Sequence, residues 1–374
     1  MEARLLHHHP ICLPRSAPLL PTSVGCVAAA RTLPREPCRP PPVATGGLAA
    51  IAVACFLDRV RRRRRRIRGR VFRGLSPEAE AYLAEALHPE LFQTKKVEEW
   101  LEPEVLRALS RWRESGDASL VDLELLPGIR VEAPGVISFA LLRPSVCASL
   151  LAEARHYSEG GFPAELPNSM NREGVILNDI GLRPVFTILL RKYLAGIAAR
   201  LLGNDSERAT HLGEVPLGTE NWGGSTLNDH HTFIVRYKPQ GDRGLAMHVD
   251  ECDITFNVGL SGGDSFVGGD LAFCGMFGDP TYRRLHHTYR HEVGRCVVHA
   301  GKRRHGVTDV EQGERASLVL WTKSLLFRGT QEYKDKCGDI VAGRKPLPEE
   351  MGPPDPICLS LTHDRDYLRW SHLL

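Results

Sequence analysis

The sequence predicts an α+β protein with helices in its N-terminal half and a jelly roll or small β-barrel in its C-terminal half. The 374 residues include 35 glycines and 26 prolines, which indicates many turns and favours a β-rich structure over a helix bundle. After about residue 231 apolar residues recur at every second position, in short runs that no helical pattern separates. Closely spaced strands of this kind are typical of a jelly roll or a small barrel.

The first segment in order, residues 1–73, is expected to be a targeting or disordered tail. Residues 43–57 form an apolar run, and residues 59–73 carry ten arginines without an acidic residue. An apolar run followed by positive charge is typical of a membrane anchor, but this run is shorter than the roughly 20 residues of a spanning helix. Three interpretations stay open: an anchor at 43–57, an organellar transit sequence, or a solvated or nuclear-localising basic stretch. The first two together favour a membrane or organellar location over a cytoplasmic or nuclear one.

Charge and cysteine content exclude two classes of protein. Residues 1–73 contribute +12 to the net charge of +3, so residues 74–374 contribute −9, which argues against nucleic-acid binding by the body of the protein. The ten cysteines include no CxxC pair and a single CxxH, at Cys296 and His299, so a zinc ribbon or finger, which needs two such pairs, is not expected. Cys252, Cys274 and Cys296 lie in apolar, strand-like runs and are expected to be reduced thiols of the core.

A helical region is predicted over 74–130. Ser76 is a typical N-cap and Pro77 a typical first helical residue. Helical patterning continues over 79–87 and again over 95–112.

Residues 131–326 are expected to form the main domain, and 327–374 a C-terminal tail. The domain begins with a strand near 131–142, a helix from Pro144 to about His156, and a second helix from Pro184 to Leu202 closed by Gly203. At least five strands then follow, at 232–237, 253–260, 271–273, 296–298 and 316–321.

These strands carry a set of residues suited to metal chemistry. On a strand, residues i and i+2 face the same side, so His248 and Asp250 can bind one cation together. A distant third ligand, His305, completes a set of two histidines and one carboxylate. This set leaves three coordination positions free and suits non-haem Fe(II), which must also bind a co-substrate and O₂.

The three free coordination positions of the metal predict the chemical class of the co-substrate. A chelating 2-oxo acid takes two positions and O₂ the third, and the far carboxylate of the acid then needs a cationic partner. Arg315, ten residues after His305, suits bidentate carboxylate binding. Tyr237, eleven residues before His248, is a candidate hydroxyl donor to the same group.

Other histidines compete for the third ligand position. His299 is the main rival of His305, because it follows the apolar strand at 296–298. His286, His287 and His291 lie in a Tyr- and Arg-rich stretch that predicts an exposed loop.

Several motifs resemble those of the 2-oxoglutarate/Fe(II)-dependent dioxygenases of the prolyl 4-hydroxylase type. Their local sequence is also similar to that of lysyl hydroxylases. They are the FIVRYKP run at 233–239, His248-Val249-Asp250 with the following TFNV, the FVGGDLAF run at 266–273, His305-Gly306-Val307, and Gly313-Glu314-Arg315 through Trp321. The PNSMNREGV run at 167–175 through 182 is similar to a narrower group, the 2-oxoglutarate and iron-dependent oxygenase domain-containing proteins of type two.

The resemblance covers roughly residues 130–325 and implies that 131–326 is a dioxygenase domain with a double-stranded β-helix (jelly-roll) core. It implies iron at His248, Asp250 and His305, 2-oxoglutarate at Arg315 with Tyr237 assisting, and no catalytic residue beyond the metal ligands. Ascorbate dependence is expected from the family.

The expected function is hydroxylation of an unactivated C–H bond, in a prolyl or lysyl side chain of a protein or peptide, with O₂ and 2-oxoglutarate consumed. A small-molecule hydroxylase, a catalytically inactive binding module and a jelly-roll metal protein that uses no 2-oxo acid stay open as alternatives. Rim loops such as 275–293 are expected to determine the substrate, and they carry no pattern that names it.

Overall fold

The computed structural model describes residues 75–202, 226–262, 264–276, 282–285 and 287–331. The predicted tail at 1–73, with its apolar run and arginines, lies outside these ranges, as do Gly203 and residues 332–374. Within these ranges, every helix is too short or too polar to span a bilayer.

A layer of short helices precedes and adjoins the strands. Ser76 accepts a hydrogen bond from the backbone of Ala79 at 3.2 Å and caps the first helix, with Pro77 at its first position, as predicted. The helices and single turns are α2 (Pro77–Leu83), η1 (Pro89–Phe92), η2 (Thr94–Trp100), α3 (Pro103–Ala108), α4 (Ser110–Ser115), η3 (Ala118–Leu120), η4 (Leu123–Leu125), α5 (Pro144–Glu159), η5 (Asn178–Leu182), α6 (Arg183–Leu189), η6 (Leu190–Leu194), α7 (Ala195–Leu202) and α8 (Leu325–Arg328).

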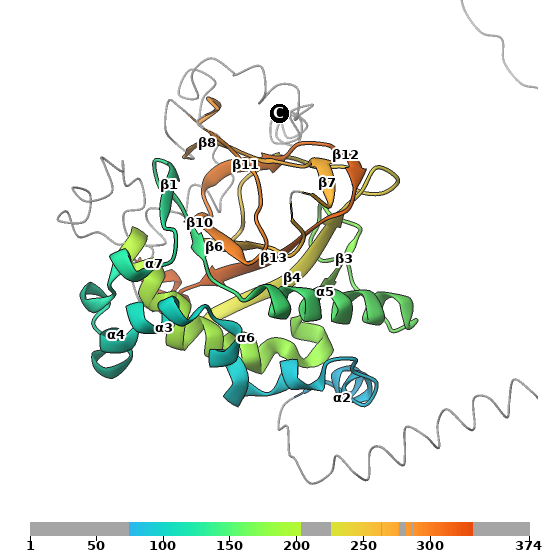
Figure 1. Cartoon of the computed structure of the whole chain (residues 1–374), viewed down its shortest axis with the longest axis horizontal. Helices are drawn as coiled ribbons and strands as arrows, with labels where there is room; N and C mark the ends of the chain where they lie inside the picture. The colour runs from blue at the N-terminus through green and yellow to red at the C-terminus, as the bar shows by residue number, and fades with distance from the viewer. Residues whose placement is uncertain (1–74, 203–225, 263, 277–281, 286, 332–374) are drawn as a thin grey trace, which may run out of the picture. The chain divides into compact units, whose positions relative to one another are not determined.

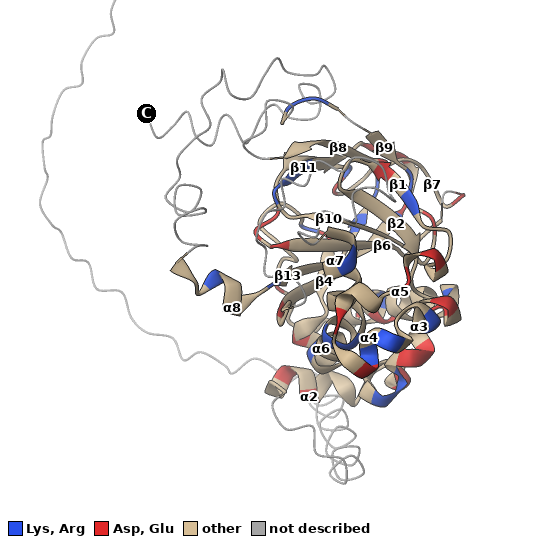
Figure 2. Cartoon of the chain, turned by 90° about the vertical axis from the view of Figure 1, so that its left-hand side faces the viewer, with Lys and Arg blue, Asp and Glu red and all other residues tan. Residues whose placement is uncertain are grey.

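The predicted helical stretch at 95–112 is divided into η2, α3 and α4. Pro103 is the cause, because proline disfavours a helical conformation in the residue before it, and Glu102 is extended. The expected helices from Pro144 and Pro184 are present, the second as a continuous run through α6, η6 and α7. Acidic and basic residues are interspersed along α3 and α4 (Figure 2), and Arg107 forms an ion pair with Glu104.

Three antiparallel sheets hold the strands. The largest has the order β1-β2-β10-β6-β13-β4-β3, the second the order β5-β11-β8-β9, and β12 pairs with β7. The strands are β1 (Arg130–Ala133), β2 (Val136–Ala140), β3 (Gly174–Ile176), β4 (Asp229–Tyr237), β5 (Leu245–His248), β6 (Ile254–Gly259), β7 (Phe266–Gly268), β8 (Leu271–Met276), β9 (His287–Tyr289), β10 (Arg295–Ala300), β11 (Arg303–Val307), β12 (Val310–Gly313) and β13 (Arg315–Lys323).

The two faces of the seven-stranded sheet have different neighbours. Phe233 and Val319 point into an apolar cluster that also contains Phe273 and Val307 of the four-stranded sheet, so the two sheets enclose one core. Ile234 and other residues of the opposite face pack with the helices, which lie beneath this sheet in Figure 1. This arrangement confirms the predicted α+β fold with a double-stranded β-helix core and flanking helices.

The cysteines of the core are in the predicted state. Cys252, Cys274 and Cys296 are reduced and buried, and so is Cys147 on α5. Burial raises the pKa of Cys147 to about 12, so this thiol stays protonated at neutral pH.

Candidate metal centre and carboxylate site

The three predicted metal ligands come together at β5 and β11 of the four-stranded sheet. His248 ends β5 and lies opposite His305 on β11, while Asp250 lies two residues beyond the end of β5. One ligand atom from each residue can be chosen so that all three lie within 4.8 Å of one another. Among the described residues, no other group of three or more histidines, cysteines and acidic residues meets this criterion.

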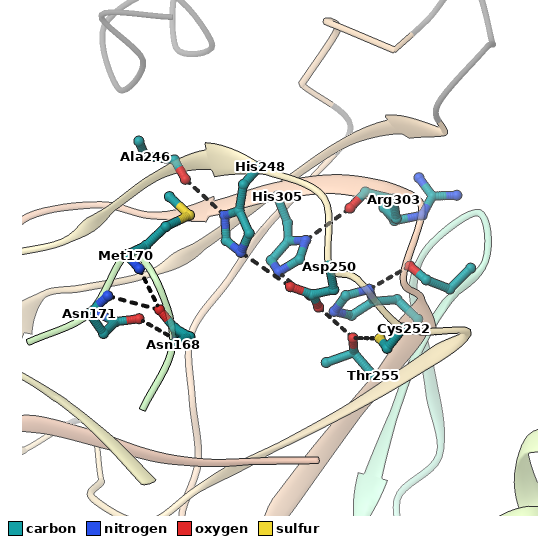
Figure 3. Close-up of polar contacts among 12 residues, drawn as sticks. Asn168, Met170, Asn171, Ala246, His248, Asp250, Cys252, Thr255, Arg303 and His305 are labelled. Atoms are coloured by element: carbon teal, nitrogen blue, oxygen red, sulfur yellow. Dashed lines mark hydrogen bonds and ion pairs between the residues drawn. The ribbon is translucent and has the colours of Figure 1, made fainter. Parts of the chain in front are cut away.

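The carboxylate of Asp250 faces the Nε2 atoms of both imidazoles (Figure 3). Its Oδ1 is 3.2 Å from Nε2 of His248, and its Oδ2 is 3.6 Å from Nε2 of His305. All three side chains are buried. Two imidazole nitrogens and one carboxylate at these distances fit a small divalent cation such as Fe(II).

Local backbone contacts orient both imidazoles. Nδ1 of His248 donates to the carbonyl of Ala246 at 2.8 Å, and Nδ1 of His305 donates to the carbonyl of Arg303 at 2.9 Å. With the proton on Nδ1, the lone pair of Nε2 is free to bind a metal. Burial lowers the pKa of His305 to about 3, so this ring is neutral at physiological pH.

Asp250 is held from both its side chain and its backbone. The hydroxyl of Thr255 donates to Oδ2, and the backbone N–H of Asp250 donates to the carbonyl of Gly301 at 2.8 Å. Residue 301 must be glycine here, because a Cβ atom would lie 2.2 Å from the carbonyl oxygen of Cys252. The turn between β10 and β11 thus presses against the loop that carries the carboxylate.

His299, the rival ligand, does not join this group. It is buried on β10 with its ring centroid 4.5 Å from that of His305, and its Nδ1 donates to the carbonyl of Ala300. Burial lowers the pKa of His299 to about 4, which keeps the ring neutral.

Arg315 and Tyr237 face each other at one end of the same core. Arg315 begins β13 opposite Tyr237 on β4, and its guanidinium lies 5.2 Å from the centre of the phenol ring. Burial lowers the pKa of Arg315 to about 10, so the group remains charged at neutral pH although it is only 1% exposed. Within the described part of the chain, no carboxylate lies at ion-pair distance from Arg315. A buried cation without a counter-ion fits a site for an anionic ligand.

Comparison with known proteins identifies the chain. A family model described as an OGFOD2-like domain matches residues 81–204. The 2-oxoglutarate and iron-dependent oxygenase domain-containing protein 2 of Homo sapiens is 30% identical over 259 residues, which cover 68% of this chain and 68% of the human protein. This chain belongs to the same family. The family is named for iron and 2-oxoglutarate, in agreement with the predicted cofactor and co-substrate.

Two further matches are weaker. One covers a smaller share of the matched protein, and the other has a lower sequence identity. Protein CP2 of the same description from Arabidopsis thaliana is 31% identical over 231 residues, which cover 57% of this chain. The match spans 52% of the Arabidopsis protein, so the chain covers about half the length of this relative. A prolyl-4-hydroxylase structure from Pseudomonas putida has a TM-score of 0.34 and 15% identity, and the match covers 50% of this chain and 92% of that one.

The segment at 167–175, whose sequence resembles the type-two group in particular, lies against β4. The carbonyl of Pro167 accepts a hydrogen bond from Nε2 of His231, and β3 pairs with β4 just beyond. Oδ1 of Asn168 accepts the backbone N–H groups of Met170 and Asn171, both at 2.8 Å (Figure 3).

Asn171 connects this segment with the carboxylate site. Burial raises the pKa of Tyr237 to about 12, and Arg315 and the Asn171 amide both act to lower it. The resemblance of this segment indicated its family but not this influence of Asn171 on the Tyr237 phenol.

The prediction that His291 lies in an exposed loop is wrong. His291 is 2% exposed, and its Nδ1 accepts a hydrogen bond from Nη2 of Arg315 at 2.6 Å. His287 of the same stretch is partly exposed on β9, and His286 lies outside the described residues. In the structure burial alternates over 287–291, with Tyr289 and His291 inward. The sequence HTYRH has no matching alternation of apolar and polar residues, so it carries no signal that could have located His291.

Proposed function

We propose that this protein is an Fe(II)- and 2-oxoglutarate-dependent dioxygenase that hydroxylates an unactivated C–H bond in a prolyl or lysyl side chain of a protein or peptide. One observation carries the proposal. The fold encloses a buried His-Asp-His group together with a buried arginine that lacks a counter-ion among the described residues.

In this proposal Nε2 of His248, Nε2 of His305 and the Asp250 carboxylate hold the iron. Bound iron supplies the activation of O₂ and the oxidation of 2-oxoglutarate to succinate and CO₂. The chain contributes orientation: the carbonyls of Ala246 and Arg303 fix the two imidazoles, and Thr255 fixes the carboxylate. His305 supplies the third ligand in preference to His299.

Arg315 and Tyr237 bind the distal carboxylate of 2-oxoglutarate. A guanidinium offers two parallel donors that match a carboxylate, and the phenol hydroxyl offers a third. The apolar side chains between the two sheets, among them Phe233 and Phe273, exclude water from the site.

The substrate class rests on the sequence motifs, which resemble those of prolyl and lysyl hydroxylases. A small-molecule substrate is the alternative. Ascorbate is proposed to sustain turnover, and residues 43–57 to anchor the protein to a membrane. On this view residues 1–73 set location and not chemistry, so a truncated chain that begins at Gly74 should keep its activity.

The test is uncoupled turnover of 2-oxoglutarate by the purified full-length protein with Fe(II) and O₂. Succinate should form only when both iron and O₂ are present, and ascorbate should increase its yield. A panel of proline- and lysine-containing peptides, followed by mass spectrometry for the gain of one oxygen atom, then tests the substrate class. An iron-loaded protein that neither binds nor consumes 2-oxoglutarate would overturn the proposal.

A further inference from the structure

We propose that His291 positions Arg315 and, together with Tyr289, completes the site for the distal carboxylate of the 2-oxo acid. This inference rests on the proposed function and assigns two residues that the sequence motifs do not mark. His291 follows β9 and reaches Arg315 from an element 24 residues earlier in the chain.

The hydrogen bond fixes the tautomer of His291. A guanidinium can only donate, so Nδ1 of His291 accepts from Nη2 of Arg315 at 2.6 Å and the ring proton resides on Nε2. Burial and the charge of Arg315 keep the pKa of His291 well below its ordinary value, in agreement with a neutral ring. His291 therefore orients the guanidinium without neutralising its charge.

The group contains three unpartnered donors. Within the described ranges, Nε2 of His291, Nε of Arg315 and the hydroxyl of Tyr289 are buried and make no hydrogen bond. The Tyr289 ring lies edge-on to the imidazole of His291, with 5.3 Å between centroids. Buried donors are normally satisfied in native proteins, so a cluster of them beside a cation fits an anion with several acceptor oxygens.

The backbone makes room for His291 at Gly259 on β6. A Cβ atom at this position would lie 2.4 Å from the carbonyl oxygen of Glu292 and 3.4 Å from Cβ of His291. Ser317 lies opposite Gly259 on β13, and its hydroxyl is 3.3 Å from Nδ1 of His291. The glycine lets the 291–292 segment lie directly against the sheet, which brings the imidazole to Arg315.

If His291 positions Arg315, its loss should affect recognition of the distal carboxylate alone. His291→Leu removes the acceptor for Arg315 and the Nε2 donor. His291→Asn keeps an acceptor near the place of Nδ1. His287→Leu is the matched control, since it removes a histidine of the same stretch that bonds to Glu132 rather than to Arg315.

Two probes separate the carboxylate from the rest of the 2-oxo acid. The first is 2-oxoglutarate, and the second is 2-oxovalerate, which has the same chain length but no distal carboxylate. Binding of each to the iron-loaded full-length protein without O₂ is measured by calorimetry, with iron content determined in parallel. Turnover is measured separately, at saturating and at subsaturating 2-oxoglutarate.

His291→Leu should weaken 2-oxoglutarate binding by roughly 10–100-fold, the range of a hydrogen bond to a charged group. The binding of 2-oxovalerate should stay within about twofold of the parent, because this acid has no distal carboxylate that could lose a contact. The loss of turnover should be largest at subsaturating 2-oxoglutarate. His291→Asn should recover much of the loss, and His287→Leu should match the parent. Tyr289→Phe, which removes one hydroxyl and keeps the ring, should weaken 2-oxoglutarate binding by a smaller factor and provides a second test should His291→Leu fail to fold.

An unchanged affinity for 2-oxoglutarate in His291→Leu and Tyr289→Phe would overturn the inference while leaving the proposed function intact. An equal loss for both probes, with iron retained, would also overturn it, because this outcome indicates a general structural role. A parent protein that holds iron but does not bind 2-oxoglutarate would instead overturn the proposed function, and this inference with it.

Discussion

The metal end and the carboxylate end of the site are held in different ways. At the metal end, each histidine donates to a backbone carbonyl two residues earlier in its own strand. At the carboxylate end, Arg315 is oriented by His291, a side chain from a different element. The first arrangement comes with the strand itself, whereas the second exists only once distant segments have packed together.

This difference decides what a substitution should do. A proposed metal ligand would contact the iron directly, and the backbone carbonyl that orients it stays in place when a neighbouring side chain is replaced. Arg315 is buried as a charge and depends on side-chain contacts, so changes there should alter ligand affinity without altering the metal.

The largest effect is expected from the loss of a metal ligand. His305→Ala should lower iron affinity by more than about 100-fold, since loss of even an outer partner costs 10–100-fold. His299→Ala should keep the iron, because His299 lies outside the ligand group. Both variants are tested by their iron content and by succinate formation. Loss of iron in His299→Ala, with iron retained in His305→Ala, would make His299 the third ligand.

The next effect is expected at Arg315. Removing one side of a buried charged contact costs about 3–5 kcal/mol, so Arg315→Ala should raise the half-saturating 2-oxoglutarate concentration by roughly 10²–10³-fold. Arg315→Lys should retain part of the affinity, and iron binding should persist in both variants. Arg243→Ala, which removes an exposed arginine, is the control. An unchanged half-saturation in Arg315→Ala would favour a metal protein that uses no 2-oxo acid.

A smaller effect is expected at Gly301, which tests whether the backbone holds the metal end. The Cβ atom in Gly301→Ala would meet the carbonyl oxygen of Cys252, so the loop that carries Asp250 must shift. We expect a loss of about 1–3 kcal/mol in the free energy of unfolding and weaker iron binding. Gly262→Ala is the control, because its Cβ meets only a side-chain methyl of Val293 at 3.3 Å. Equal iron affinity and stability in the two variants would contradict the proposed support.

The sequence allowed most of the fold to be predicted where its signals are local. The helix starts at Pro77 and Pro144, and the apolar strands β4, β6 and β13, follow from residue type and spacing. The division of 95–112 at Pro103 was missed because the apolar pattern continues across it. Strands such as β11, which carries His305, are short and polar, so their periodicity is too weak to reveal them.

The same distinction applies to the site. His248 and Asp250 are two residues apart and their spacing alone predicts a shared face. His291 was placed in an exposed loop because its role depends on Gly259 and Arg315, which only the folded sheet brings near it. A motif search finds residues that are close in the sequence more readily than residues that only the fold brings together.

The buried charge of Arg315 links the lifetime of the protein to the supply of its proposed co-substrate. A ligand that binds only the folded chain raises the free energy of unfolding, by about 2.7 kcal/mol when its concentration is 100 times its dissociation constant. Since proteases act on chains that have opened, degradation should slow as the 2-oxoglutarate concentration rises. The cell would then hold more of this protein when its proposed co-substrate is abundant, without any change in synthesis.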